Sequence, residues 1–263
     1  MSSITPSVDL SKLLHLAQMA AQEIMMVYAS DFAVKAKADL SPVTEADAMA
    51  EKVILKGLKE LWPDVPVLAE EAASGGEVPD VGNRFFLVDP LDGTKEFLSR
   101  NGEFTVNIAL IENGRPVMGV VYAPATEQMF WGEQAKGAGF AKLKSGDSLP
   151  DIKWSAIHVR PTPAEGLTVV ASRSHMDANT TAHLETCKVK SLTSAGSSLK
   201  FCLVAMGEAD LYPRFGRTME WDTAAGQAVL EAAGGKVCNV DGTPLHYGKA
   251  DRGFDNPAFI ASS

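Results

Sequence analysis

Acidic residues follow apolar runs at two places in the first half of the chain. In "FFLVDPLDGTKEF" the run ends in Asp89 and Asp92, and "VLAEE" ends in Glu70 and Glu71. Carboxylates at neighbouring strand ends repel one another unless a hard cation lies between them. Mg²⁺ suits this position because it binds carboxylates and phosphate oxygens together. The turn after Asp92 exposes backbone N–H groups that can bind phosphate, so these residue types point to metal-assisted phosphate chemistry.

Two further acids lie in segments that suit the same chemistry. Asp47 follows Thr44 in "PVTEAD", and Asp222 precedes a predicted helix in "MEWDTAAGQAVLEAAGG". Each also has an ordinary structural explanation, because [ST]-x-x-[DE] is a capping box and Asp is a favoured N-cap residue. Asp89 at a strand end and Glu70 in a solvated loop can be explained in the same way. No single motif therefore identifies a site.

Taken together and in order, "VTEAD", "LAEE", "LVDPLDGTKEF" and "WDTAAGQAVLEAAGG" resemble the motifs of the lithium-sensitive, magnesium-dependent phosphatase family of inositol monophosphatase. The resemblance covers nearly the whole chain, and its paired D-P-x-D-G-T and W-D-x-A-A-G signatures are specific. Within the family, "DGTKEFL", "SRSH" and "GSSLKFCLVAMGEADLYPRFG" are most similar to the CysQ-type 3′(2′),5′-bisphosphate nucleotidases. The resemblance implies an α+β fold, the layered αβαβα sandwich of the sugar phosphatases, with the site between two lobes.

The resemblance also implies a role for each residue of the motifs. Asp47 and Thr94 are expected to polarise the attacking water, with Glu70 as a further catalytic residue. The backbone of Gly93 and Thr94 is expected to hold the reacting phosphate. Roughly two to three Mg²⁺ ions would neutralise the phosphate, activate the water and stabilise the leaving oxygen, so no covalent intermediate is needed. The implied metal ligands are Glu70, Asp89, Asp92, Asp222 and the main-chain carbonyl of Leu91.

Substrate choice depends on cations away from the metal ligands. The nucleotidase branch implies hydrolysis of adenosine 3′,5′-bisphosphate to AMP and phosphate, which requires a site for a second phosphate. Lys200, Arg214 and Arg173 are candidates for that site, and each is equally well explained as a solvated surface charge. Lys95 and Glu96 stand where many inositol phosphatases have Thr-Asn, which favours the bisphosphate branch. Further candidates to line the pocket are Ser172, Ser174 and His175. The residues expected to contact substrate as well as metal are Glu70, Leu91, Asp92 and Asp222.

Three other functions are compatible with parts of this pattern. Members of the same family act instead on inositol 1-phosphate or fructose 1,6-bisphosphate. A haloacid-dehalogenase-type phosphatase also has D-x-D-G-T after a strand, with the first Asp as a covalent nucleophile, but here the acids are further apart. A non-catalytic, metal-dependent phosphate-binding regulator is expected to lack an implied ligand or the Asp47–Thr94 pair, and all of these are present.

Hydrophobic periodicity predicts the elements that position these residues. Helical spacing indicates helices over residues 9–30 and 44–61. An apolar strand begins at Arg84 and is expected to end at Pro90, which lacks a donor for the sheet. Residues 103–140 are rich in strand-forming residues. In the second half strands alternate with helices, and "GKVCNV" is expected to be the last strand.

Three prolines between residues 142 and 165 mark the expected boundary between lobes. We place an N-terminal α+β lobe, with most of the metal ligands, over residues 1–155. A C-terminal α/β lobe over residues 156–263 would carry Asp222 and the residues that determine substrate specificity, because alternating strands and helices form layered α/β structures.

Composition and charge narrow the class of protein further. The chain has 263 residues, 46% hydrophobic and 22% charged, and a net charge of −9, which argues against binding a nucleic-acid polymer. No apolar stretch is long enough to span a membrane. The cysteines Cys187, Cys202 and Cys238 show no close pairing, so we expect reduced thiols in a cytoplasmic protein. Relatives include monomers and homodimers, and the CysQ resemblance implies peripheral association with the cytoplasmic face of the inner membrane, although no residue argues for it.

Overall fold

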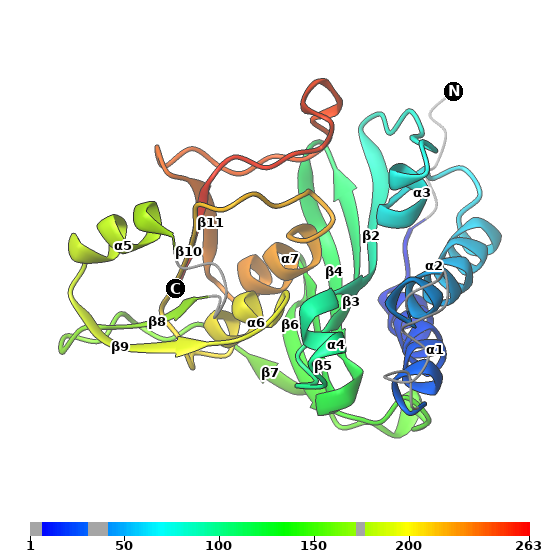
Figure 1. Cartoon of the computed structure of the whole chain (residues 1–263), viewed down its shortest axis with the longest axis horizontal. Helices are drawn as coiled ribbons and strands as arrows, with labels where there is room; N and C mark the ends of the chain where they lie inside the picture. The colour runs from blue at the N-terminus through cyan, green and yellow to red at the C-terminus, as the bar shows by residue number, and fades with distance from the viewer. Residues whose placement is uncertain (1–6, 31–41, 172–176) are drawn as a thin grey trace.

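Two β-sheets with a layer of helices between them make up the fold (Figure 1). The structure is a computed structural model, and it describes residues 7–30, 42–171 and 177–263. Within these residues the first sheet contains, in spatial order, β1 (Val67–Ala69), β2 (Arg84–Asp92), β3 (Thr105–Glu112), β4 (Arg115–Ala123), β5 (Gln128–Glu133), β6 (Gly137–Lys142) and β7 (Ser155–Ile157). The second contains β11 (Lys236–Asn239), β12 (Phe259–Ser262), β10 (Leu211–Arg214), β8 (Leu167–Ala171) and β9 (Val189–Ser194).

The helices form three layers around these sheets. The helices are α1 (Leu10–Tyr28), α2 (Pro42–Leu61), α3 (Glu70–Ser74), α4 (Thr94–Leu98), α5 (Ala178–Glu185), α6 (Leu199–Ala205) and α7 (Ala224–Ala232), with 3₁₀ turns η1 (Pro124–Thr126), η2 (Leu149–Asp151) and η3 (Ala250–Arg252). Figure 1 shows α1 and α2 on the outer side of the first sheet, α6 and α7 between the sheets, and α5 beyond the second sheet. This order confirms the predicted αβαβα sandwich.

The outer layer forms because α1 and α2 are amphipathic and pack together against the first sheet. Asp9 caps α1 by accepting the backbone N–H of Ser11 at 2.9 Å, and the helix buries a continuous face that includes Leu13, Ala17 and Ile24. These side chains share one apolar cluster with the inner residues of β2, β3 and β4. Among the helices of the described residues, none is long and apolar enough to cross a membrane.

The central layer forms because α7 lies unusually close to the first sheet. A Cβ atom added to Gly119 of β4 would lie 2.7 Å from the Ala225 carbonyl oxygen, and one added to Gly132 of β5 would lie 2.5 Å from that of Ala228. Glycine in these strands therefore allows the close approach. Apolar residues of both sheets and of α6 and α7 form one buried cluster. The two sheets share this core. The predicted division into lobes after residue 155 stays a prediction.

Two predictions about strands were wrong. Pro90 does not end β2: the strand continues to Asp92, with a break in its pairing register to β3 between Asp89 and Asp92. A bulge tolerates a residue without an N–H donor, which is why proline is accepted inside this strand. The second error concerns the C-terminus, where "GKVCNV" forms β11 but β12 follows it and lies between β11 and β10.

Candidate active site

Three carboxylates from separate segments converge beside the end of β2. Glu70, Asp89 and Asp222 each offer an oxygen atom, and these atoms all lie within 4.8 Å of one another. Glu70 begins α3 directly after β1, and Asp89 lies in β2. Because β1 and β2 are parallel neighbours, their carboxyl ends bring these two acids to the same edge of the sheet. Asp222 reaches them from the loop before α7, so the site joins the two halves of the sequence.

The bulge in β2 directs Asp92 to the same region. Asp92 pairs with Thr105 of β3, and its carboxylate Oδ2 lies 3.4 Å from the Ser198 hydroxyl. Asp92 is not one of the three acids whose oxygens cluster. Burial raises the pKa values of Glu70, Asp89 and Asp222, and the charge of Asp92 raises each of them further, so Asp92 belongs to the same electrostatic site.

The turn after Asp92 requires glycine. Gly93 has φ +102°, a conformation that L-residues rarely adopt, and a Cβ atom there would lie 2.3 Å from the Ser197 hydroxyl and 3.2 Å from Phe104 Cα. The Ser197 hydroxyl lies 2.7 Å from the Asp92 carbonyl oxygen and 2.8 Å from that of Glu103. The segment before α6 is thereby joined to the end of β2, directly beside the acids.

Burial and mutual repulsion disfavour the charged form of these acids. Burial is the largest cause of the raised pKa of Asp89, and the charge of Glu70 is the next. The pKa of Asp222 is raised by burial and then by the charge of Asp92. Asp47, on α2, has its pKa raised to about 8 by burial and then by Glu71 and Glu70. A bound cation would reverse this balance, because it favours the carboxylate form of every acid around it.

Buried polar atoms without partners surround the acids. Within the described residues, Asp47 Oδ1 and Thr105 Oγ1 are buried and have no hydrogen-bond partner. Thr105 lies opposite Asp92 on β3. Buried polar atoms are almost always paired, so these atoms indicate a site that takes a polar ligand. The clustered donors are all carboxylate oxygens, as Mg²⁺ or Ca²⁺ requires, and the cluster contains no His or Cys that would favour zinc.

A cleft of about 250 Å³ has Asp92 and Asp222 in its wall, together with Lys200 and Arg214. Lys200 is only 5% exposed, and burial lowers the pKa of its ammonium group to about 8. Its Nζ donates to the Ser197 carbonyl oxygen at 2.6 Å. The cleft therefore presents both carboxylate and cationic side chains to a ligand.

Comparison with known proteins identifies the fold that carries this cleft. Residues 9–259 match the inositol monophosphatase family. The chain belongs to this family.

The relatives include a bisphosphate nucleotidase, and the similar solved structures are members of the inositol monophosphatase family. The chain is 48% identical over 260 residues to the 3′(2′),5′-bisphosphate nucleotidase CysQ of Escherichia coli (strain K12), covering 96% of this chain and 99% of the relative. A crystal structure of CysQ from Bacteroides thetaiotaomicron matches with a TM-score of 0.84 and 37% identity, covering 97% of this chain and 96% of that one. An inositol monophosphatase from Zymomonas mobilis matches with a TM-score of 0.78 and 25% identity, covering 97% and 92%.

Most of the predicted site residues of this family member lie together. Asp92, Gly93, Thr94, Lys200, Arg214 and Asp222 line the cleft, as do Lys95 and Glu96. Glu70 and Asp89 complete the acid cluster, and Leu91, between the two aspartates of β2, is buried. Ser172, Arg173, Ser174 and His175, also predicted to contact substrate, lie outside the described residues.

The sequence reasoning missed residues that shape the site without belonging to an acidic motif. Ser197 and Ser198 contact Asp92, and Ser198 Oγ also donates to the Asp222 carbonyl oxygen at 2.9 Å. Glu51 of α2 accepts the backbone N–H groups of Glu71 and Ala72, each at 2.9 Å, and so fixes the start of α3. The "GSSLK" motif was a signal for the serines. Nothing in the sequence distinguished Glu51 from an ordinary helix acid.

Proposed function

We propose that the chain is a Mg²⁺-dependent 3′(2′),5′-bisphosphate nucleotidase that hydrolyses adenosine 3′,5′-bisphosphate to AMP and phosphate. The observation that carries this proposal is a single cleft that combines Asp92 and Asp222 with Lys200 and Arg214. The acids can hold metal ions for the phosphate that reacts, and the cations can hold the phosphate that stays. A monophosphate has no second phosphate group for Lys200 and Arg214 to bind. The identity of 48% to CysQ of Escherichia coli supports the same substrate.

The acids of the site fit the proposed metal ions. All side-chain donors are carboxylates, and burial, together with the charges of neighbouring acids, raises the pKa values of Glu70, Asp89 and Asp222 in the metal-free protein. When bound, roughly two to three Mg²⁺ ions supply positive charge that neutralises the phosphate and stabilises the departing oxygen. We assign the ligands to Glu70, Asp89, Asp92, Asp222 and the carbonyl oxygen of Leu91.

Asp47 and Thr94 orient the attacking water in this proposal. Asp47 lies on α2 and Thr94 begins α4, and these two helices are in contact. Asp47 Oδ1 is buried and has no hydrogen-bond partner within the described residues, so it can accept the proton of the water. Its pKa of about 8 in the metal-free protein means that it becomes an effective base only when positive charge is added nearby. The charge of Glu70 also contributes to the raised pKa of Asp47. Glu70 is assigned to the same step because it would be a ligand of the bound Mg²⁺.

The two phosphate groups bind to different parts of the cleft wall. The first turn of α4 begins at Thr94, and N–H groups in a first turn have no acceptor within the helix, so Gly93 and Thr94 can donate to the reacting phosphate. Lys200 and Arg214 bind the second phosphate. Burial lowers the pKa of Lys200 to about 8, and a phosphate dianion beside it would keep it charged at neutral pH.

A phosphate-release panel tests the function directly. Adenosine 3′,5′-bisphosphate, inositol 1-phosphate and fructose 1,6-bisphosphate are compared with Mg²⁺, with EDTA, and with Mg²⁺ plus Li⁺. We expect the highest kcat/KM for the nucleotide, no release in EDTA and inhibition by Li⁺. Equal or higher kcat/KM for either sugar phosphate would replace the proposed substrate by another of the family. Tight Mg²⁺-dependent nucleotide binding without phosphate release would identify a regulator instead of an enzyme.

We also propose that the protein is cytoplasmic and works as a monomer or homodimer. Its three cysteines are free in the structure, as expected for a reducing compartment. No feature of the described residues supports the association with the inner membrane that the resemblance implied. Light scattering after size-exclusion chromatography measures the oligomeric state, and fractionation of cells measures the location.

A further inference from the structure

Asp222 differs from the other acids because it lies on a loop outside the sheets. We call residues 218–223 the Asp222 loop and residues 246–256 the C-terminal clamp. Between them there is one isolated β-bridge, Met219 to Asp255, within the described residues. The Met219 N–H donates to Asp222 Oδ2 at 2.8 Å. Among the described residues, it is the one hydrogen-bond donor to that carboxylate. The orientation of Asp222 therefore depends on the peptide before Met219.

Asn256 of the clamp binds both peptides around Met219. Its backbone N–H donates to the Thr218 carbonyl oxygen at 2.9 Å, which belongs to the same peptide group as the Met219 N–H. Its side-chain Nδ2 donates to the Met219 carbonyl oxygen at 2.7 Å and lies 3.0 Å from Thr223 Oγ1. Asn256 is only 5% exposed, so water does not compete for these bonds. The residue thus fixes the direction of the N–H group that contacts Asp222.

A buried ion pair attaches the clamp to the same loop. Glu220 is fully buried, and its carboxylate accepts the backbone N–H groups of Gly248 at 2.7 Å and Lys249 at 2.9 Å. The ammonium group of Lys249 lies 2.7 Å from Glu220 Oε1 and donates to Asn256 Oδ1 at 3.2 Å. A buried carboxylate with three donors is well compensated, and it orders both segments. The charge pair therefore also orients the side-chain amide of Asn256.

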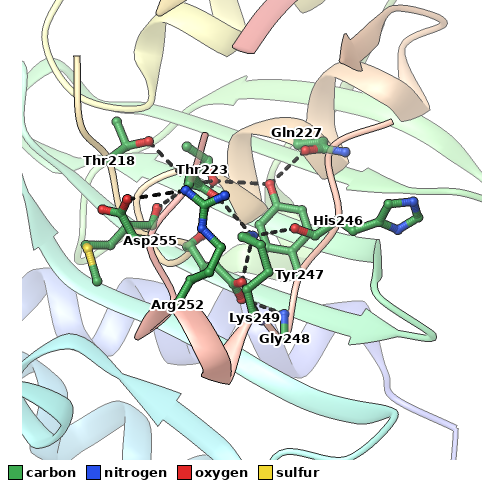
Figure 2. Close-up of polar contacts among 12 residues, drawn as sticks. Thr218, Thr223, Gln227, His246, Tyr247, Gly248, Lys249, Arg252 and Asp255 are labelled. Carbon is green, nitrogen blue, oxygen red and sulfur yellow. Dashed lines mark hydrogen bonds and ion pairs between the residues drawn. The ribbon is translucent and has the colours of Figure 1, made fainter. Parts of the chain in front are cut away.

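Tyr247 extends the network to α7. Figure 2 shows its hydroxyl between Gln227 and Thr223, with distances of 2.7 Å to Gln227 Oε1 and 3.1 Å to Thr223 Oγ1. Thr223 follows Asp222 directly, so the loop is bound on both sides of the acid. None of the contacts made by Tyr247 reaches the side chain of a cleft acid. The network is connected to the Asp222 carboxylate by the Met219 N–H.

We propose that Asn256 is a positioning residue for divalent-cation binding, acting through the Met219 peptide on Asp222. The Met219 N–H holds Asp222 Oδ2 at 2.8 Å, and Asp222 offers a carboxylate oxygen to the cluster with Glu70 and Asp89. The inference rests on the proposed metal site. It adds a residue, Asn256, that is not itself a proposed metal ligand. Residues that orient metal ligands typically change metal affinity by about 10–100-fold when altered.

The variant Asn256→Asp tests the side-chain part of this inference. It keeps the size of the side chain and removes the Nδ2 donor to the Met219 carbonyl oxygen and Thr223 Oγ1, while the backbone bond to the Thr218 carbonyl oxygen remains. Binding of Mg²⁺ to the substrate-free protein is measured by isothermal titration calorimetry. We expect affinity to fall by about 10–100-fold with an unchanged circular dichroism spectrum. In activity assays the Mg²⁺ concentration for half-maximal rate should rise by the same factor, while kcat recovers at saturating Mg²⁺. The matched control is Asn239→Asp, whose amide donates to Thr243 Oγ1 at 2.9 Å in a turn outside the clamp, and it should bind Mg²⁺ like the wild type.

The outcomes separate this inference from the proposed function. A folded Asn256→Asp protein with wild-type Mg²⁺ affinity overturns the inference and leaves the function intact. If the wild type binds no Mg²⁺, the proposed metal site and the inference both fail. If Asn256→Asp does not fold, Asn256→Ser decides, because it removes the Nδ2 donor to the Met219 carbonyl oxygen without adding a buried charge. We then expect Mg²⁺ binding weaker by about 2–10-fold, the value of one hydrogen bond, and unchanged affinity overturns the inference.

Discussion

The two sides of the acid cluster are built in different ways. Asp89 and Asp92 lie in β2, whose backbone pairs with β1 on one side and β3 on the other, and Glu70 directly follows β1. Asp222 lies on a loop whose conformation depends on buried polar side chains of residues 246–256. A sheet fixes side-chain direction through its backbone ladder, whereas the loop depends on a few individual hydrogen bonds.

This difference has consequences for mutation. On the sheet side, the position of each acid is determined by many backbone bonds, so only changes to the acids themselves or to the Gly93 turn should be severe. On the loop side, we expect changes to single buried polar residues such as Asn256 and Tyr247 to alter metal affinity, although neither residue touches a proposed metal ligand. The comparison therefore predicts where distant substitutions matter and where they do not.

The largest effect is expected from Asp92→Asn on the sheet side. This change removes a proposed ligand charge, and kcat should fall by at least about 10²–10³-fold, as when electrostatic stabilisation of a transition state is lost. Thermal stability of the metal-free protein should not fall, because neutralising one of several mutually repelling acids relieves repulsion. Phosphate release and thermal melting measure both effects. Asp64→Asn, at an exposed aspartate, is the control, and wild-type turnover by Asp92→Asn would remove this residue from the ligand set.

The next effect is expected from Gly93→Ala, which tests the turn that joins β2 to α4. The added Cβ would lie 2.3 Å from Ser197 Oγ at φ +102°. We expect a loss of about 1–3 kcal/mol in the free energy of unfolding and, from misplacement of the phosphate site, about 10²-fold in kcat. Gly82→Ala is the matched control, because Gly82 has φ +55° with nothing within 4 Å of its added Cβ. Equal effects of the two variants would show that backbone strain, and not contact with Ser197, matters.

A smaller and more selective effect is expected from Lys200→Met. The variant loses a cation from the cleft, so KM for adenosine 3′,5′-bisphosphate should rise by about 10–100-fold, the value of a charge-assisted hydrogen bond. KM for adenosine 3′-phosphate, which lacks the second phosphate, should change much less. Lys188→Met is the control, because Lys188 is an exposed lysine that donates to the Ala164 carbonyl oxygen at 2.8 Å. An equal rise for both substrates would deny Lys200 a role in binding the second phosphate.

The elements of the sheet side could be predicted from sequence because each leaves a local signal. Apolar runs end in Glu70 and Asp89, and a glycine follows Asp92 where the turn needs positive φ. The αβαβα fold came from the order of the motifs through the family resemblance. Local rules failed for the passage of β2 through Pro90, because a bulge depends on how the neighbouring strand pairs.

The loop side left no comparable signal. Asn256 and Met219 are distant in sequence, and their contact arises only when residues 246–256 fold over the Asp222 loop. Glu220 is an acid in an acidic motif, yet the structure shows it paired with Lys249 and not with the acid cluster. Strand β12 was missed for the related reason that its few residues gain their strand partners, β10 and β11, only in the folded sheet.

The smallest expected effect concerns the stability of the metal-free protein as pH changes. Burial, with the charges of Glu71 and Glu70, raises the pKa of Asp47 to about 8 in the folded protein, whereas an unfolded aspartate has a pKa of about 3.9. Between these values the folded state binds the proton more tightly. The resulting stability is fully present below about pH 4 and is lost as pH rises toward about 8.

We therefore expect the metal-free protein to melt at least about 2–4 °C lower at pH 8 than at pH 5, equivalent to about 1 kcal/mol. Calorimetry in EDTA measures this, and excess Mg²⁺ should reduce the dependence because it stabilises the carboxylate forms. Asp47→Asn and Asp222→Asn should each flatten part of the profile, since an amide does not titrate. If only Asp47→Asn does so, the repulsion is confined to Asp47 and the acids of the sheet side, and the loop relaxes to relieve Asp222. A flat wild-type profile would contradict the raised pKa values on both sides.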